Sequence, residues 1–479
     1  MLLLALAAPA NGAIELQGLH AYPDRESVPA GETIRFHVSS RVPYRFGVSK
    51  LGLRVDDRTS DETIFLAGKV SPARVQPIHP GSFVRVKNGL PADAELTALT
   101  LECWVRPWKL SQWQGILTQH DYPDRCGFGL FLDAGGRAVF SIGSGGAYDG
   151  GSLVTGPKLN LRQWHHLVGV WDAEAKIATI WVDGKRAAEW QAPNNLPPRK
   201  AGPAGLQIGA YSERGVTGRF FDGDIAMPAI YTRALAADEI AARLAKRGLE
   251  APDLGDPAIA AFWPLDEERG SSVADASGNR RDGQIVNLGT WMIGGPSFDG
   301  GSVGRYDTSY DPRTDPNRGH GLRLASDDLY DCGWEATEVF RVPKNAKSGI
   351  YAAWFGFELE GMPHRYPVTF VVNKAKGAPK APLALMCAST TWRAYGGTPF
   401  AKNVPDETRN WPTGGQPNDP SNPPAYCFYR DHAHGQPTYK LGLRMPWPVA
   451  GPGVRYSAPG VGYSHLMRGE RFTHVWLEK

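Results

Sequence analysis

Residues 164–190 read WHHLVGVWDAEAKIATIWVDGKRAAEW, and this stretch decides the fold. Short runs of apolar and β-branched residues are separated by polar turn residues, which is the pattern of consecutive β-strands. Asp183-Gly184 stands between two of these runs, and Asp-Gly in that position is the signal of a tight β-hairpin. Similar runs lie at residues 99–108, 127–143 and 206–211, so we predict an array of short strands.

A short helix and one more strand complete this array. The alanine-rich end of residues 221–244 predicts the helix, and residues 261–286 add a strand and a loop. The whole resembles a laminin-G-like, concanavalin-type jelly roll. The phrases that carry the resemblance are Trp164-His165-His166-Leu167, Val182-Asp183-Gly184, Phe221-Asp222-Gly223 and Asp275-x-Ser277-Gly278-Asn279. The resemblance implies a fold and leaves the function open, because jelly rolls of this kind bind sugars or calcium, or only brace a neighbour.

A second β-rich pattern stands on both sides of the jelly roll. Residues 28–55 alternate apolar and polar side chains between Pro and Gly turns, and residues 334–358 and 365–372 repeat that pattern. We therefore expect a small β-sandwich of residues 14–70 plus 291–373. Residues 71–290 would be the jelly roll inserted into it.

The last part of the chain has a different composition. The linker NKAKGAPKAP at 373–382 marks a domain boundary, and LALMCAS at 383–389 predicts a buried strand of a parallel sheet. TTWRAYGG at 390–397 would then lie at a carboxyl strand end, where functional groups of such sheets collect. The predicted fold is mainly β: a small β-sandwich with an inserted laminin-G-like jelly roll, followed at residues 380–479 by the start of a truncated α/β Rossmann-like domain.

Composition excludes several classes of partner. The chain has 479 residues, is 42% hydrophobic and 21% charged, and carries a net charge of +3, without a basic stripe for nucleic acid. No segment reaches the roughly 18 apolar residues of a membrane span, so we expect no membrane partner. The N-terminal MLLLALAAPANGA lacks a basic n-region. We favour a cytoplasmic location, or a periplasmic or secreted one if this segment is a truncated signal peptide.

The predicted jelly roll carries few groups suited to catalysis. Asp183, Asp222, Asp224 and Asp275 are candidate calcium ligands, although each lies in a Gly-containing turn where Asp favours a structural role. Glu102 is the only acid of residues 99–108, which argues against the paired carboxylates of sugar cleavage.

The five cysteines have wide spacing and no CxxC pair, which excludes zinc-ribbon and thioredoxin-like sites. A disulfide between Cys103 and Cys126 is the alternative to buried free thiols.

Tyrosines and histidines gather in the last part of the chain, at Tyr395, Tyr429, Tyr439, His432 and His434. The His-x-His spacing would place two imidazoles on one strand face as metal ligands, or else it lies in a solvated loop. A tyrosinate ligand requires a metal that removes a proton from a phenol whose ordinary pKa is about 10.

CASTTWRAY at 387–395 and YRDHAHG at 429–435 resemble the N,N-dimethylformamidase large-subunit family, and the resemblance extends over nearly the whole chain. It implies a mononuclear ferric iron held by two tyrosinates and one glutamate. Tyr395 matches the first tyrosine, and Tyr429 is our choice for the second, with Tyr439 as the alternative. The resemblance further suggests His432 as the catalytic group that passes a proton to the leaving amine. Trp392 would form a substrate-binding wall.

Two features depart from the family pattern. His434 stands where the family has Asp, and a Gly-Ser-His-Pro-Glu-Tyr-like motif with the third ligand does not occur before the chain stops at RFTHVWLEK. We therefore expect a fragment of a longer protein that is inactive by itself, with the ligand glutamate beyond Lys479.

The predicted function is a large-subunit fragment of an amide hydrolase that cleaves the C–N bond of a small amide with ferric iron as Lewis acid. The resemblance also implies a small helical partner subunit and self-association of the large subunit. The alternatives are a non-catalytic, carbohydrate-binding laminin-G-like module of an extracellular protein and a non-catalytic assembly subunit.

Overall fold

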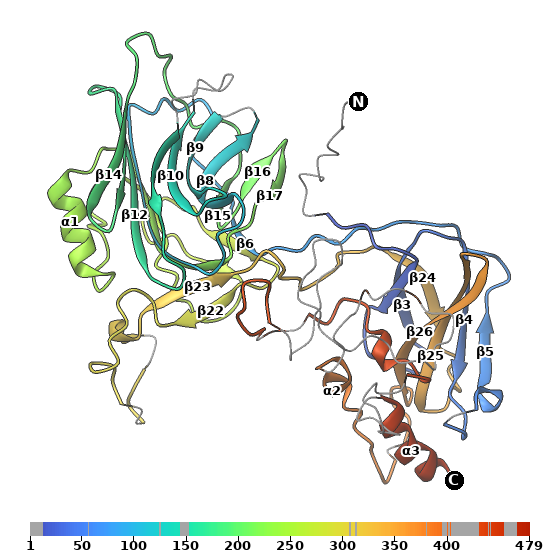
Figure 1. Cartoon of the computed structure of the whole chain (residues 1–479). Coiled ribbons are helices and arrows are strands. Elements are labelled where there is room, and N and C mark those ends of the chain that lie inside the picture. The colour runs from blue at the N-terminus through green and yellow to red at the C-terminus, as the bar shows by residue number, and fades with distance from the viewer. Residues whose placement is uncertain are drawn as a thin grey trace, which may run out of the picture. The chain divides into compact units, whose positions relative to one another are not determined.

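The computed structural model divides into two compact units, which are residues 80–328 and residues 13–79 together with 329–479 (Figure 1). It describes residues 13–55, 57–123, 126–143, 153–305, 308–311, 314–379, 381–394, 400, 403, 431–438, 440, 442–454 and 467–479.

The first unit is a jelly roll of two sheets. One sheet has the order β11 (Leu153–Lys158), β10 (Arg137–Ile142), β9 (Cys126–Leu132), β8 (Gln114–Tyr122), β15 (Leu206–Ile208), β6 (Phe83–Val86), β21 (Gly283–Val286) and β20 (Ser272–Val273), with β16 (Tyr211–Glu213) on β8 and β17 (Val216–Gly218) on β16. The other has the order β14 (Lys185–Gln191), β13 (Ile177–Val182), β12 (His165–Asp172), β7 (Ala98–Pro107), β18 (Gly223–Tyr231), β23 (His320–Leu324) and β22 (Thr290–Ile293), with β19 (Ile259–Phe262) on β18. This architecture confirms the predicted jelly roll.

Both faces of β7 are buried. Leu99, Leu101 and Cys103 point into the core between the sheets, whereas Trp104 belongs to a second apolar cluster on the outer face. The helix α1 (Ala237–Lys246) contributes Ile240 to that outer cluster. It is the alanine-rich helix that the sequence predicts. Polar groups at the intervening positions of β7 are therefore enclosed beneath α1.

The turn between β13 and β14 follows the Asp-Gly signal. Asp183 has φ of 51° and Gly184 has φ of 73°. Positive φ at both central residues is the backbone of a type I′ hairpin, which glycine tolerates best. The predicted hairpin is confirmed.

The second unit contains a β-sandwich built from separated stretches of sequence. One sheet has the order β1 (Leu19–Pro23), β3 (Thr33–Ser40) and β24 (Ala336–Arg341). The other has the order β2 (Ser27–Pro29), β26 (Met362–Asn373), β25 (Gly349–Leu359), β4 (Tyr44–Lys50) and β5 (Glu62–Leu66). Phe36, Phe46, Phe355 and Phe370 fill the core between them, with ring centroids 5.4–6.1 Å apart. The predicted small β-sandwich is confirmed.

Strands β22 and β23 lie in the jelly roll. Thr290 pairs with Arg323, and Gly223 of β18 pairs with Leu324. The sequence analysis assigned residues from 291 onward to the sandwich, whereas the sheet of the first unit continues to residue 324. The apolar pattern of these short strands does not reveal which sheet they join.

The described part of residues 380–479 contains helices α2 (Ser389–Ala394) and α3 (Met467–Glu478) and the 3-10 turn η4 (Pro448–Ala450). Residues 383–388 form no strand, and Leu383 and Met386 are 62% and 89% exposed. The predicted buried strand is wrong at this position, because an apolar run alone does not specify what covers it. The Rossmann-like domain is thus not confirmed in the described residues.

Cys103, Cys332 and Cys387 are free thiols, so the Cys103–Cys126 disulfide is not formed. Among the described residues, no helix combines the length and the apolar composition that crossing a membrane requires.

Candidate functional site

The residues predicted to hold iron fall outside the described part of the chain. Tyr395, Tyr429 and the alternative Tyr439 all lie there, whereas Trp392 and His432 are described. The candidate site therefore consists of the α2 residues, which come before Tyr395 in sequence, and of the residues of the second unit that contact them.

Trp392 lies on the buried face of α2 and is 1% exposed. Its ring stacks on Trp447, with centroids 6.2 Å apart and planes 23° apart, within the apolar cluster that includes Phe400. The indole Nε1 atoms of Trp392 and Trp447 have no hydrogen-bond acceptor in the described structure. Two enclosed N–H groups thus remain as donors for a polar ligand, which is consistent with a wall of a binding site.

Arg393, which the sequence analysis did not single out, is the most unusual group of this region. Its side chain is 5% exposed, and its guanidinium carbon lies 4.1 Å from the ring centroid of Trp447. Nη2 forms an ion pair of 2.8 Å with Glu26 Oε1, but Nε and Nη1 have no acceptor among the residues that the structure describes. Burial lowers the pKa of Arg393 to about 10, against the opposing charge of Glu26.

A buried cation with two unsatisfied N–H groups loses stability unless an acceptor arrives, since each such donor costs about 1–3 kcal/mol. The arrangement therefore favours an anionic or carbonyl oxygen as ligand. Glu26 also accepts a hydrogen bond from Ser389 Oγ at the start of α2. The helix is thus held at both ends by one carboxylate of the sandwich.

His432 and His434 lie in a tight turn rather than on a strand. The His432 N–H donates to Gln436 O at 2.7 Å, and the Gly435 N–H donates to His432 O at 2.8 Å. The imidazole rings stack at 5.0 Å with planes 29° apart, and both residues are buried. The predicted strand face is wrong, and so is the solvated loop.

A second group of possible metal ligands is formed by the segment before α2 and by α3. One ligand atom each of Cys387, Glu470 and His474 lies within 4.8 Å of the others. Burial, with the charge of Glu470, raises the pKa of Cys387 to about 11. Burial lowers the pKa of His474. The pair Glu470 and His474, four residues apart, was a sequence signal for one helix face that the sequence analysis did not use.

In the jelly roll, Asp224 is fully buried on β18 and is occupied by protein donors. Its Oδ2 accepts from Arg106 Nε at 2.7 Å and from Trp108 Nε1 at 2.8 Å, and its Oδ1 accepts from Arg323 Nε at 2.7 Å. This single carboxylate bridges two guanidinium groups. This environment supports a structural role for Asp224 rather than calcium binding.

The other candidate calcium ligands are also engaged. Asp183 accepts from the His166 backbone N–H at 2.9 Å, and Asp275 accepts from the Arg281 backbone N–H at 2.9 Å. Asp222 accepts from Ser326 N–H at 2.7 Å, and burial raises its pKa to about 6. These contacts are those of turn and core aspartates.

Glu102 occupies the enclosed face of β7. Its oxygens lie 3.0 Å from His166 Nε2, accept from Tyr231 Oη at 2.9 Å and accept from Arg243 Nε at 3.1 Å. Burial acts to raise the pKa of Glu102, but the hydrogen bonds and charges of His166 and Arg243 outweigh it and lower the pKa to about 2. Glu102 is a fixed anion, which does not suit a general acid.

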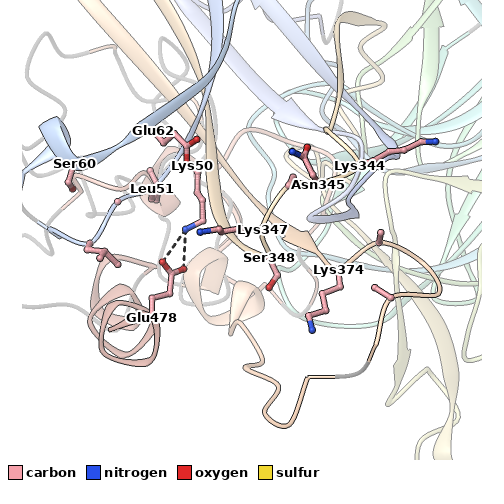
Figure 2. Close-up of a pocket in the computed structure, with 15 residues that line it drawn as sticks. Lys50, Leu51, Ser60, Glu62, Lys344, Asn345, Lys347, Ser348, Lys374 and Glu478 are labelled. Carbon is pink, nitrogen blue, oxygen red and sulfur yellow. Dashed lines mark hydrogen bonds and ion pairs between the residues drawn. The ribbon is translucent and has the colours of Figure 1, made fainter.

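A cavity of about 780 Å³ opens beside the sandwich in the second unit. Lys50, Lys344, Lys347 and Lys374 line it, and Figure 2 shows Lys50 directed at Glu478, with contacts of 3.0 and 3.3 Å. The excess of lysine suits an anion better than a small neutral amide. This cavity is therefore not the candidate amide site.

The C-terminal part of the chain is similar to a known family. Residues 292–478 match the family of N,N-dimethylformamidase beta subunit-like C-terminal regions. The chain is similar to N,N-dimethylformamidase beta subunits. Those of an Alcaligenes species and of Paracoccus aminophilus are 26% and 25% identical to it, and each covers 79% of this chain and 52% of its own length. The chain thus spans about half the length of these curated relatives, and the predicted resemblance is confirmed.

Residues 81–241 match the concanavalin A-like lectin/glucanase superfamily, in agreement with the jelly roll. Among solved structures, Ruminococcus gnavus IT-sialidase CBM40 bound to α2,3-sialyllactose is 14% identical, with a TM-score of 0.29 over 34% of this chain and 93% of its own. The heptameric SAP-like pentraxin of Limulus polyphemus is 12% identical, with a TM-score of 0.27 over 42% of this chain and 82% of its own. Neither similarity bears on the chemistry of this chain.

Proposed function

We propose that this chain is a large-subunit part of a metal-dependent amide hydrolase of the dimethylformamidase type, which cleaves the C–N bond of a small amide. The observation that carries the proposal is the similarity to N,N-dimethylformamidase beta subunits over 79% of the chain. The coarser assignment, a dimethylformamidase-like hydrolase, follows from that similarity; the iron, the bond cleaved and the substrate are the proposal. A small helical partner subunit and self-association belong to the same proposal.

We propose Tyr395 and Tyr429 as two of the iron ligands. The described residues before Tyr395 suit an anionic donor set, because Arg393, two residues earlier in sequence, has two buried N–H groups without an acceptor among the described residues. A guanidinium favours the deprotonated form of a neighbouring phenol. When bound, ferric iron would supply Lewis acidity toward the amide carbonyl.

The remaining roles belong to side chains of the chain itself. Trp392, held against Trp447, would limit the pocket to a small substrate and exclude water from it. His432 is buried in the turn of residues 432–436 and would deliver a proton to the departing amine nitrogen. Expulsion of the amine requires that proton, since the deprotonated amine is a poor leaving group.

The test is iron analysis with a visible spectrum, on this chain and on a form lengthened at its C-terminus to the span of the curated relatives. We expect bound iron and a broad tyrosinate-to-iron band in the lengthened protein, lost in Tyr395→Phe. Tyr330→Phe, at a tyrosine that is 48% exposed, is the matched control and should keep the band. Release of dimethylamine from N,N-dimethylformamide should follow the band.

A lengthened protein without iron and without the band would overturn the proposal. The carbohydrate-binding alternative would then be tested by glycan binding to the jelly roll. The engaged carboxylates of that unit do not favour a calcium-dependent form of it.

A further inference from the structure

Cys387, Glu470 and His474 come together from segments far apart in the sequence. Cys387 precedes α2, whereas Glu470 and His474 lie one helical turn apart on α3. Cys387 Sγ lies 3.7 Å from His474 Nε2, across a separation of 87 residues. The Glu470 carboxylate accepts from the Ala388 backbone N–H at 3.2 Å, which holds the acid beside the thiol.

We propose that these three side chains bind one divalent transition-metal ion of the zinc class. In a tetrahedral zinc site with Zn–S of about 2.3 Å and Zn–N of about 2.1 Å, the sulfur and the nitrogen lie about 3.6 Å apart. The observed 3.7 Å between Cys387 Sγ and His474 Nε2 agrees with this separation. The three ligand atoms lie within 4.8 Å of one another, so a shift of about 1 Å by the Glu470 carboxylate would complete the set.

The donor set defines the class of metal. A thiolate and an imidazole favour zinc, cobalt or other borderline-soft divalent ions over magnesium or calcium, which prefer oxygen. The proposed iron ligands, by contrast, are hard phenolate oxygens, so the two sites would differ in metal preference. Three protein ligands leave one coordination position for water or a further donor.

A bound ion would join α3 to the segment that precedes α2. Glu470 and His474 share one face of α3, because residues four apart on a helix lie above each other. The Ala388 contact fixes the backbone beside Cys387. Since Cys387 and His474 are 87 residues apart, the ion would close a long loop and so remove conformational freedom from the unfolded chain.

The test is titration of the full chain with Co²⁺ alone, after chelator treatment and under reducing conditions. We expect a thiolate-to-cobalt charge-transfer band in the near ultraviolet that saturates at one equivalent and disappears when Zn²⁺ is added. Cys387→Ala should abolish the band. His474→Ala and Glu470→Gln should weaken cobalt binding at least tenfold, because loss of a group that only orients a ligand already costs about 10–100-fold in metal affinity.

Cys332→Ala is the matched control, because Cys332 is a buried free thiol of the same unit that lies outside the cluster. This variant should keep the band and the affinity. Circular dichroism of each metal-free variant checks that the variant folds. The titration of the wild-type protein tests the proposal even if a variant fails to fold.

Absence of a thiolate band in the wild type would overturn the proposal, and so would a band that survives Cys387→Ala. An equal loss in Cys332→Ala would also overturn it, because the sulfur ligand would then be unassigned. A Cys387 Sγ to His474 Nε2 hydrogen bond would in those cases account for the contact. The band reports a thiolate, so the outcome does not depend on iron binding by Tyr395.

Discussion

Arg393 and Arg471 are both buried arginines of the second unit, 5% and 2% exposed, but their partners differ. Arg471 on α3 donates from Nη1 to Val55 O at 3.1 Å and from Nη2 to Gly52 O at 2.9 Å. It also forms an ion pair of 3.4 Å with Asp61, whose side chain is 7% exposed. Arg393 has one ion pair and two N–H groups without acceptors among the described residues. We predict opposite consequences when each is replaced by methionine, which preserves much of the apolar stem.

For Arg393→Met, the losses are the pair with Glu26, whose side chain is 31% exposed, and the contact with Trp447. These contribute about 1 kcal/mol and about 1–2 kcal/mol respectively. The variant also removes two unsatisfied buried donors that cost about 1–3 kcal/mol each. The free energy of unfolding should therefore stay within about 1 kcal/mol of wild type or rise. Arg471→Met should lower it by about 3–5 kcal/mol, the loss typical of removing one member of a buried ion pair.

The assay is hydrogen exchange of amides in β25 and β26 as a function of urea, because these strands report the second unit separately from the jelly roll. Exchange in Arg471→Met should be about a hundredfold faster or more at low urea, which corresponds to roughly 3 kcal/mol. An equally large loss in Arg393→Met would refute the reasoning, since Arg393 would then be a fully partnered structural residue. If the vacant donors of Arg393 serve an anionic site, iron affinity should fall in Arg393→Met although stability does not.

Three further outcomes concern the jelly roll. Asp222→Asn should leave the free energy of unfolding unchanged or raise it at pH 7. Burial raises the pKa of Asp222 to about 6, so the ionised carboxylate lowers the stability of the folded state above that pH. Asp224→Asn should cost about 3–5 kcal/mol, because it leaves Arg106 and Arg323 without their shared carboxylate; urea unfolding of both variants checks the contrast. Since the pKa of Glu102 is lowered to about 2 in the folded state, its contribution to stability is complete above its unfolded value of 4.5 and is lost as the pH falls toward 2. Glu102→Gln should flatten the acid limb of stability over that pH window, whereas Glu250→Gln, at an exposed pair, should not.

The strands of the jelly roll were predictable because their signals are local. Alternating side chains mark each strand, and Asp183-Gly184 marks the turn that joins two of them. The sheet that each strand joins was not predictable in every case, since Thr290 pairs with Arg323 through contacts that no local pattern encodes.

The segment before α2 shows the opposite case. Its apolar residues satisfied the pattern of a buried strand, yet Leu383 and Met386 are exposed. An apolar run indicates that a segment favours burial, but it does not indicate which part of the protein buries it. The contacts of Arg393 and Cys387 were not predicted for a related reason. Glu26 is hundreds of residues from Arg393 in sequence, and His474 is 87 residues from Cys387.

The short helix α2 links the two proposed metal chemistries. A helix of this length is not stable by itself in water, so its position depends on tertiary contacts at its ends. Cys387 lies just before its first turn, and Glu26 contacts both Ser389 and Arg393. Because Tyr395 follows the last residue of α2 in sequence, any contact that fixes the helix also fixes the point from which the chain continues to that residue. We therefore expect an ion bound by Cys387 to influence iron binding at Tyr395 through the position of this helix.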